Sequence, residues 1–347
     1  MFTLISHTGM TLPYAQLAPH PTRPAVATEG AAVPNHRRVT RRLGLQALLA
    51  AAVTVPLSSA AIPASSASPV WVSPARSDPS PSAKGRRAPR LDVMTFNLRF
   101  ASTTEPNSWR DRRPVMRELL HRAHPQIIGT QEGLYQQLRD IDYDLGPDYA
   151  WIGTGREGGS RDESTAIFYD TRRLAPVEHY TFWLSDTPEV IRSNTWGAAF
   201  PRIVTWIRFR DLADDGREFY VLNTHFDHAS QYARERSASL MIQRIAQLDH
   251  SLPVVVTGDF NVAAHENPVY DTLTGSGLVD AWDAAVRRSA LYGTFHGYKG
   301  LTPNGERIDW ILTSPWVTTH RASVNTFSVN GQFPSDHLPV EASLSLE

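Results

Sequence analysis

A series of short apolar runs, each ending in polar side chains, constrains this chain more than any other feature. The six polar segments are Thr95-Phe96-Asn97, Gln131-Glu132, Asn223-Thr224-His225, Gly258-Asp259-Phe260-Asn261, Arg307-Ile308-Asp309 and Ser335-Asp336-His337. The apolar runs have the length and composition of buried strands. A buried strand has no structural need to end in carboxylates, amides and imidazoles. If these ends converge, they form one pocket of oxygen and nitrogen ligands, which suits a hard divalent cation and phosphate-ester hydrolysis.

The order of the predicted elements indicates an α/β (α+β) fold in which two β-sheets pack together with helices outside. The pattern predicts strands over 91–96, 126–130, 164–169, 203–209, 219–222, 253–257, 308–312 and 338–344, and helices over 109–123 and 230–249. The fully apolar run 253–257 is expected in the centre of a sheet. A turn at 214–216 joins two strands into a hairpin. Ser230 is expected to cap the second helix, with Leu240, Met241, Ile245 and Leu248 as its buried stripe.

The first 90 residues differ in composition from the rest. Arg41-Arg42, an apolar run at about 43–55 and small residues at two later sites predict a cleavable signal peptide within 1–67. The two arginines are compatible with the twin-arginine route and with the general secretory route. Residues 68–90 are rich in Ser, Pro and Ala and predict a disordered linker, which leaves 91–347 as the domain. We therefore expect a secreted, extracellular protein without a stable membrane anchor.

Charge and cysteine content exclude several classes of function. Residues 1–89 hold nine of the 34 Lys and Arg and two of the 35 acidic residues, so the remainder carries a formal net charge of −8. Such a domain is a poor non-specific binder of long nucleic acid, although a local basic groove remains possible. The chain has no Cys, which excludes disulfides, thiolate metal sites and cysteine nucleophiles.

Asp259 and Asn261 are the sharpest candidates for chemistry. Gly258 lets the backbone turn after a central strand, and two residues spaced by one face the same side. A carboxylate can accept a proton from water or bind a metal, and an amide can hold a phosphoryl oxygen or the nucleophile. A simple Asx turn at a strand end is the alternative interpretation.

Asp309 and His337 form a predicted pair. Asp309 lies in an apolar run, where a lone carboxylate is costly unless it is paired. We expect Asp309 to orient the imidazole of His337. Asp336 and His337 precede the last strand, and a surface turn is the alternative for them.

Three further residues end apolar runs with a possible ligand atom. His225 can donate a hydrogen bond to a phosphoryl oxygen, whereas His228 is expected to support the loop. Asn97 and Glu132 each offer an oxygen, although a cap or a turn would explain either of them alone. The combination of six such strand ends favours a common site.

These residues, in this order and with these local contexts, resemble the endonuclease/exonuclease/phosphatase superfamily, which has the deoxyribonuclease-I-like fold. The resemblance covers about residues 91–345. It implies a four-layer sandwich and a Mg²⁺-dependent phosphoesterase in which Mn²⁺ can substitute. By position, Glu132 is the principal metal ligand, with Asn97 and Asp336 close to it. Asp259 positions or deprotonates the attacking water, Asn261 and His225 hold phosphoryl oxygens, and His337, oriented by Asp309, acts as acid or base.

The segments 181–185, 196–202 and 225–228, with Arg234, resemble a bacterial branch akin to deadenylase-like and sugar-phosphate phosphatase members. Arg99, Arg202 and Arg234 are candidates to clamp a phosphate monoester, and structural salt bridges are the alternative for each. We therefore expect a monomeric enzyme acting on a small soluble phosphate ester, such as a sugar phosphate or another phosphomonoester or phosphodiester. An extracellular nuclease is the first alternative, with nucleic acid as a less favoured partner, and an inactive binding module is the second. An Arg-lined closed pocket would favour monoesters.

Overall fold

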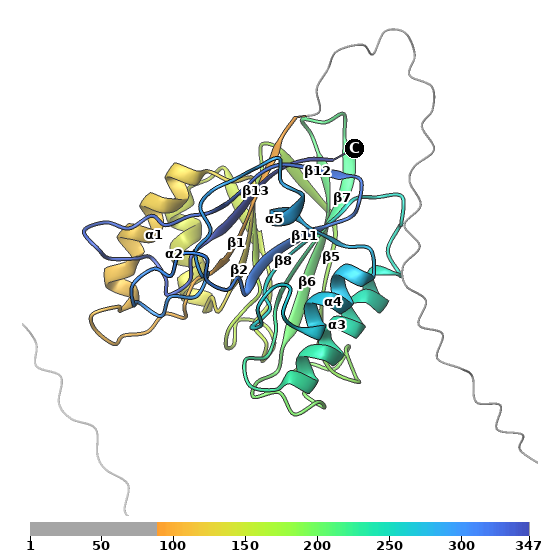
Figure 1. The fold of residues 1–347 in the computed structure, drawn as a ribbon, viewed down its shortest axis with the longest axis horizontal. Helices are drawn as coiled ribbons and strands as arrows, with labels where there is room; N and C mark the ends of the chain where they lie inside the picture. Colours follow the sequence, from red (N-terminus) through yellow and green to blue (C-terminus); the bar gives the residue numbers. More distant parts are fainter. Residues whose placement is uncertain (1–88, 347) are drawn as a thin grey trace, which may run out of the picture. The chain divides into compact units, whose positions relative to one another are not determined.

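A computed structural model describes residues 89–346, so the predicted signal peptide and nearly all of the predicted linker lie outside the described residues. Two β-sheets form the centre of the fold (Figure 1). The first has the order β10 (Arg287–Arg288), β12 (Val317–Val324), β13 (Val340–Leu346), β1 (Leu91–Asn97), β2 (Ile127–Gln131), β4 (Ile167–Asp170), β3 (Tyr149–Ile152). The second has the order β5 (Leu174–Trp183), β6 (Ile203–Asp211), β7 (Arg217–His225), β8 (Val254–Asp259), β11 (Asp309–Thr313), β9 (Val279–Asp280).

Helices cover the outer faces of both sheets, which gives the four layers of a sandwich. Helices α1 (Trp109–Ala123) and α2 (Tyr135–Leu145) lie on the first sheet (Figure 1). Helices α3 (Gln231–Ile245) and α4 (Pro268–Gly275) lie on the second, and the short α5 (Ala281–Ala284) contacts β11 and β12. The prediction of two packed sheets with helices outside is therefore confirmed. None of the helices among residues 89–346 has the length and apolarity needed to cross a membrane.

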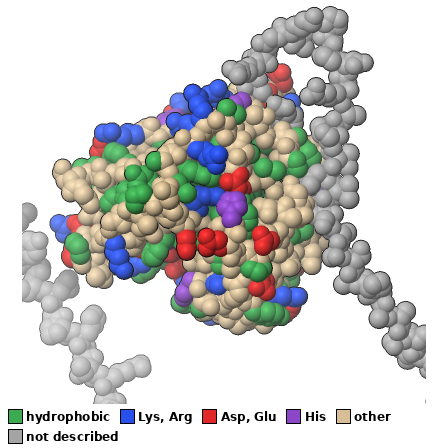
Figure 2. Space-filling model, viewed as in Figure 1, with side chains coloured by type: hydrophobic (Ala, Val, Ile, Leu, Met, Phe, Trp, Pro, Cys, Tyr) green, Lys and Arg blue, Asp and Glu red, His purple; other side chains and the backbone are tan. Residues whose placement is uncertain are grey.

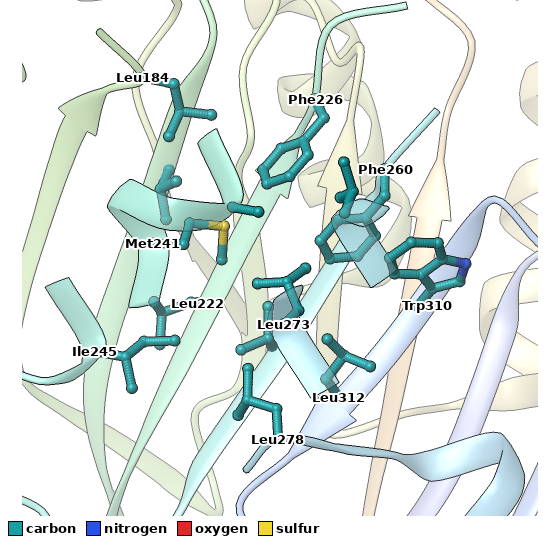
Figure 3. Close-up of a cluster of buried hydrophobic side chains, with 14 of the residues drawn as sticks. Leu184, Leu222, Phe226, Met241, Ile245, Phe260, Leu273, Leu278, Trp310 and Leu312 are labelled. Carbon is teal, nitrogen blue, oxygen red and sulfur yellow. The ribbon is translucent and has the colours of Figure 1, made fainter. Parts of the chain in front are cut away.

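Apolar side chains fill the spaces between these layers. Leu91, Ile207 and Val255 belong to the core between the sheets. A second core packs α3 and α4 against β8 and β11, and Figure 3 shows it in close-up. There the rings of Phe260 and Trp310 stack with their centroids 4.3 Å apart. Phe260 lies directly between Asp259 and Asn261, so this stacking anchors the turn that carries both polar side chains.

Most of the predicted elements occur at the expected places. Strands β6 and β7 form the predicted antiparallel hairpin, and β8 is an interior strand with every residue buried. Ser230 caps α3 by accepting a hydrogen bond from the backbone nitrogen of Ala233. The expected extent of α3 was wrong, because the helix ends at Ile245 rather than near Asp249. The Asp249 side chain instead accepts hydrogen bonds from Ser251, an arrangement that competes with continued helix.

Strand pairing brings the polar segments to one end of the sandwich. Strands β1 and β2 are parallel, with Asn97 opposite Gln131. Strands β7 and β8 are also parallel, with His225 opposite Asp259, and antiparallel β11 places Asp309 opposite Asp259. Because the carboxyl ends of parallel strands meet at the same edge of a sheet, both sheets present their functional side chains at this end.

Candidate active site

The predicted residues gather at one cavity of about 340 Å³. Six of them line it: Glu132, His225, Asp259, Asn261, Asp336 and His337. Asn97 and Asp309 lie directly behind the lining, and both are fully buried. The structure therefore brings all eight candidates together, although 240 sequence positions separate the first from the last.

His337 lies between two carboxylates. Its Nδ1 is 3.0 Å from Oδ2 of Asp309, and its Nε2 is 3.8 Å from Oδ2 of Asp259. Burial alone would lower the pKa of His337, but the charges of Asp309 and Asp259 outweigh it and raise this pKa to about 10. The predicted pairing of Asp309 with His337 is thus present, and the imidazole is held in its charged form.

Asp259 is the centre of the hydrogen-bond network. Its Oδ2 accepts from Nδ2 of Asn97 at 2.9 Å and lies 3.5 Å from Nε2 of His225. Burial and the neighbouring charge of Asp309 raise the pKa of Asp259, which makes it a stronger base than an exposed aspartate. Burial and the cation of Arg202 lower the pKa of His225 well below its usual value, so His225 is neutral.

Three lining residues have left-handed backbone conformations, and Arg99 is one of them with a φ of 54°. Glu132 has a φ of 62° and Asn261 a φ of 55°. The turn at Asn261 is stabilised because its backbone nitrogen donates to Oδ1 of Asp259. The Asn261 side chain donates one amide hydrogen to the carbonyl of Phe226, which leaves the other for a substrate. Such strained conformations persist where the surroundings fix them, as at functional sites.

The carboxylates in the cavity suit a hard divalent cation. Glu132, Asp259 and Asp336 supply oxygen donors, and no softer thiolate ligand exists in the chain. Glu132 is fixed by Nδ2 of Asn97 and by the backbone nitrogen of Phe100. The donor set therefore fits a hard divalent cation, and at this cavity the ligand atoms of Asp259, Asp309 and His337 lie within 4.8 Å of one another. Metal binding by Glu132 and Asp336 stays a prediction.

Asn97 is placed differently from a direct ligand. Its Oδ1 accepts from the backbone nitrogen of Arg99, and its amide nitrogen bridges Glu132 and Asp259. In this orientation Asn97 positions two carboxylates and turns its oxygen away from them. Direct ligation by Asn97 stays a prediction.

A buried polar network behind the cavity connects the two sheets. The side-chain nitrogen of Gln131 donates to Thr95 and to Oδ1 of Asn223, and Thr257 donates to the same oxygen. Nδ2 of Asn223 donates in turn to the backbone carbonyl of Thr130. The network fixes the register between the sheets, on which the convergence of the site depends.

The three predicted arginines are placed differently from one another. Arg99 and Arg202 line the cavity, and Arg99 forms an ion pair of 3.3 Å with Asp336. Nη2 of Arg202 is 3.1 Å from Nδ1 of His228, which also lines the cavity. Arg234 does not line it, because its guanidinium donates to the carbonyl of Asp227 and to Gln231. Arg234 therefore supports the loop at Asp227 through hydrogen bonds, whereas the ion pairs belong to Arg99 and to Arg202, which is 3.4 Å from Oδ2 of Asp227.

Several lining residues were not predicted as site residues, among them Arg156, Glu163, Phe200 and Phe295. Arg156 donates to Oε2 of Glu163 at 2.8 Å, and its guanidinium lies 4.3 Å from the ring centroid of Phe200. Burial raises the pKa of Glu163 to about 7. The sequence signal for Arg156 and Glu163 was the glycine-rich segment 153–159. Such a segment predicts a close-packed loop, but it does not indicate which side chain enters a cavity.

A family model described as Endonuclease/Exonuclease/phosphatase family matches residues 94–337. The chain belongs to this family. Its members are hydrolases that act on phosphate esters. The match covers every predicted site residue and all strands of both sheets except β13 and the first three residues of β1.

Several solved structures are similar to this chain. A family member from Bacteroides thetaiotaomicron is 36% identical, with a TM-score of 0.70, and the alignment covers 76% of this chain and 100% of that one. A mannosyl-6-phosphatase from the same organism is 37% identical, with a TM-score of 0.69, over 73% and 99% of the two chains. The human Nocturnin catalytic domain, at 18% identity and a TM-score of 0.59 over 75% and 96%, shares the fold.

A curated relative covers less of the chain. The Drosophila melanogaster protein angel is 26% identical over 181 residues, which are 50% of this chain and 49% of the relative. This chain therefore matches about half the length of that relative. Membership of the family rests on the family model and the bacterial structures.

Proposed function

We propose that this protein is a secreted phosphomonoesterase that depends on Mg²⁺, with Mn²⁺ as a substitute, and hydrolyses a small soluble phosphate ester such as a sugar phosphate. The observation that carries the proposal is the lining of the cavity by two arginines, Arg99 and Arg202, beside the candidate catalytic side chains. A monoester carries up to two negative charges on its phosphoryl group, and guanidinium groups suit such a dianion. The mannosyl-6-phosphatase relative, 37% identical, supports this substrate class.

The side chains divide the reaction among them. A bound divalent cation would supply charge neutralisation and a polarised water at Glu132 and Asp336. Asp259, with its raised pKa, accepts a proton from the attacking water. Neutral His225 and the amide of Asn261 donate to phosphoryl oxygens, and these bonds strengthen as charge develops on those oxygens. The charged His337, held by Asp309, lies beside Asp259 and stabilises the transition state or protonates the leaving group.

A nuclease is the alternative within the same family. The formal net charge of −8 on residues 90–347 disfavours the binding of long polyanions such as nucleic acid. On the face shown in Figure 2, acidic, basic and apolar side chains are mixed, without a continuous band of Lys and Arg. A D. rerio TDP2 complexed with single-strand DNA product is only 14% identical to this chain, so this similarity concerns the fold alone.

We also propose that the protein is exported and acts as a monomer. Export is supported by the basic, apolar and small-residue pattern within residues 1–67. Absence of Cys suits an oxidising compartment, because the fold needs no reduced thiol. Detection of the processed chain in the culture medium of its source organism tests this proposal, and exclusive recovery from the cytoplasm contradicts it.

The test of function is a substrate panel. Purified residues 89–347 are incubated with Mg²⁺ and with p-nitrophenyl phosphate, hexose 6-phosphates, bis-p-nitrophenyl phosphate, plasmid DNA and RNA. The proposal predicts release of inorganic phosphate from the monoesters, with kcat/KM at least tenfold higher than for the diester. Cleavage of plasmid or RNA without monoesterase activity would falsify it.

A further inference from the structure

One wall of the cavity has no part in the phosphoryl chemistry described above. It consists of Arg156, Glu163 and Phe200, which we call the Arg156 wall. We propose that the Arg156 wall is the leaving-group subsite and that it binds the hydroxyl-bearing ring of a sugar phosphate. This inference rests on the proposed phosphomonoesterase function, because it assigns the part of the substrate that the phosphate carries.

Phe200 offers an apolar surface to a ligand. Its side chain is 44% exposed, although it lies on the rim of a polar cavity. The guanidinium of Arg156 covers part of the ring, at 4.3 Å from the centroid. The exposed remainder can pack on the apolar C–H face of a pyranose ring, because binding sites use aromatic side chains for such surfaces and polar groups for orientation.

Arg156 and Glu163 offer the matching polar groups. Nη1 of Arg156 donates to Oε2 of Glu163, and no side chain or backbone donor among residues 89–346 is seen on Oε1. A carboxylate beside a guanidinium recognises adjacent hydroxyls, since a hydroxyl donates to the first and accepts from the second. A neutral polyol satisfies both groups.

The acidic component of this wall also discriminates against other substrates. Glu163 and Asp162 both pair with Arg156, so the cation is largely neutralised within the wall. A second phosphate or a polynucleotide backbone placed here would meet these carboxylates and be repelled. The wall therefore selects an uncharged leaving group.

The wall is held in place without a ligand. Nε1 of Trp183 donates to the backbone carbonyl of Arg156 at 2.8 Å, and the backbone nitrogen of Arg156 donates to the carbonyl of Glu163. Gly155 has no space for a side chain, because a Cβ there would lie 1.9 Å from the carbonyl oxygen of Arg161. Such a rigid arrangement loses little entropy when the ligand binds.

The experiment compares a hexose 6-phosphate with p-nitrophenyl phosphate, which carries the same phosphoryl group on an aryl leaving group. Glu163→Gln and Phe200→Ala are measured beside two matched controls, Glu178→Gln and Tyr232→Ala, which replace exposed residues outside the cavity. We expect kcat/KM for mannose 6-phosphate to fall about 10- to 100-fold in both wall variants, mainly through KM. The preference for the sugar phosphate over the aryl phosphate should fall at least tenfold, and both controls should keep it.

Equal losses on the two substrates, or no loss on either, would overturn the subsite. So would a wild-type enzyme that hydrolyses p-nitrophenyl phosphate but no hexose phosphate. A wild-type enzyme without monoesterase activity would instead refute the proposed function, so the two failures are distinguishable. If Phe200→Ala does not fold, it is replaced by Phe200→Leu, which keeps most of the apolar volume but lacks the aromatic ring.

Discussion

Replacing Asp309 with Asn isolates the charge that orients His337. Oδ2 of Asp309 is 3.0 Å from Nδ1 of His337, and Oδ1 is buried with no hydrogen-bond partner among residues 89–346. Asn keeps the volume and one acceptor, so the imidazole keeps its position but loses the countercharge.

The size of the effect follows from the geometry. Two unit charges about 4 Å apart interact with about 4 kcal/mol at an effective dielectric constant of about 20. A hydrogen bond to a charged group is worth about 1.5–3 kcal/mol. A loss of about 2–4 kcal/mol in the transition state lowers kcat about 30- to 1,000-fold. KM should change by less than about threefold, because Asp309 is fully buried and does not line the cavity.

The assay is steady-state hydrolysis of p-nitrophenyl phosphate by Asp309→Asn, with thermal unfolding to verify the fold. Asp211→Asn is the matched control, because Asp211 is equally buried and forms an ion pair of 2.8 Å with Arg173 at the far end of β6. The control should lose stability but keep kcat within about threefold. If Asp309→Asn retains the wild-type kcat while folded, the role assigned to the pair is wrong.

Three further predictions follow from the site and the fold. Glu132→Gln should lower kcat at least about 100-fold, and chelation of the wild type should abolish turnover that Mg²⁺ or Mn²⁺ restores; full activity in chelator would contradict both. Gly129→Ala should lower the free energy of unfolding by about 1–3 kcal/mol in urea titrations, because its Cβ would lie 2.0 Å from Oγ1 of Thr257. Burial raises the pKa of Glu163 from 4.5 to about 7, so the folded state binds this proton more tightly and stability falls as pH rises between these values. In Glu163→Gln the free energy of unfolding should therefore decrease less over this pH range, by a difference of about 3 kcal/mol at most. A pH dependence of stability identical to that of the wild type would count against the buried carboxyl.

The site was predictable from the sequence to the extent that polar groups ended apolar runs. Asp259, Asp309 and His337 could be found because a polar side chain beside a buried strand needs a partner or a function. The hydrogen-bond bridging by Asn97 could not be found in this way, because it depends on which atom of the amide faces Glu132.

The remaining wall of the cavity depends on loop geometry. Arg156 and Glu163 lie on a loop whose path is set by turns. The backbone carbonyl of Arg156 accepts a hydrogen bond from the side chain of Trp183, which lies in a strand distant in sequence. No local pattern encodes such a contact. The unpredicted strand β5 has a related cause, since Pro176 and an exposed centre mark it as an edge strand with an irregular register at that point. Local sequence thus indicated the strands that carry the site, whereas edges, loops and the elements β12, α2 and α4 were not predicted.

Crystals grown with Mn²⁺ give the most direct measurement of the central claim, that the strand ends of both sheets meet around one divalent cation. The anomalous difference map should place the ion in the cavity, in contact with the carboxylate of Glu132 and within reach of Asp336. A Mn²⁺ peak elsewhere, for example at the exposed pair His265 and Asp283, with the cavity empty under conditions that support turnover, would contradict the account.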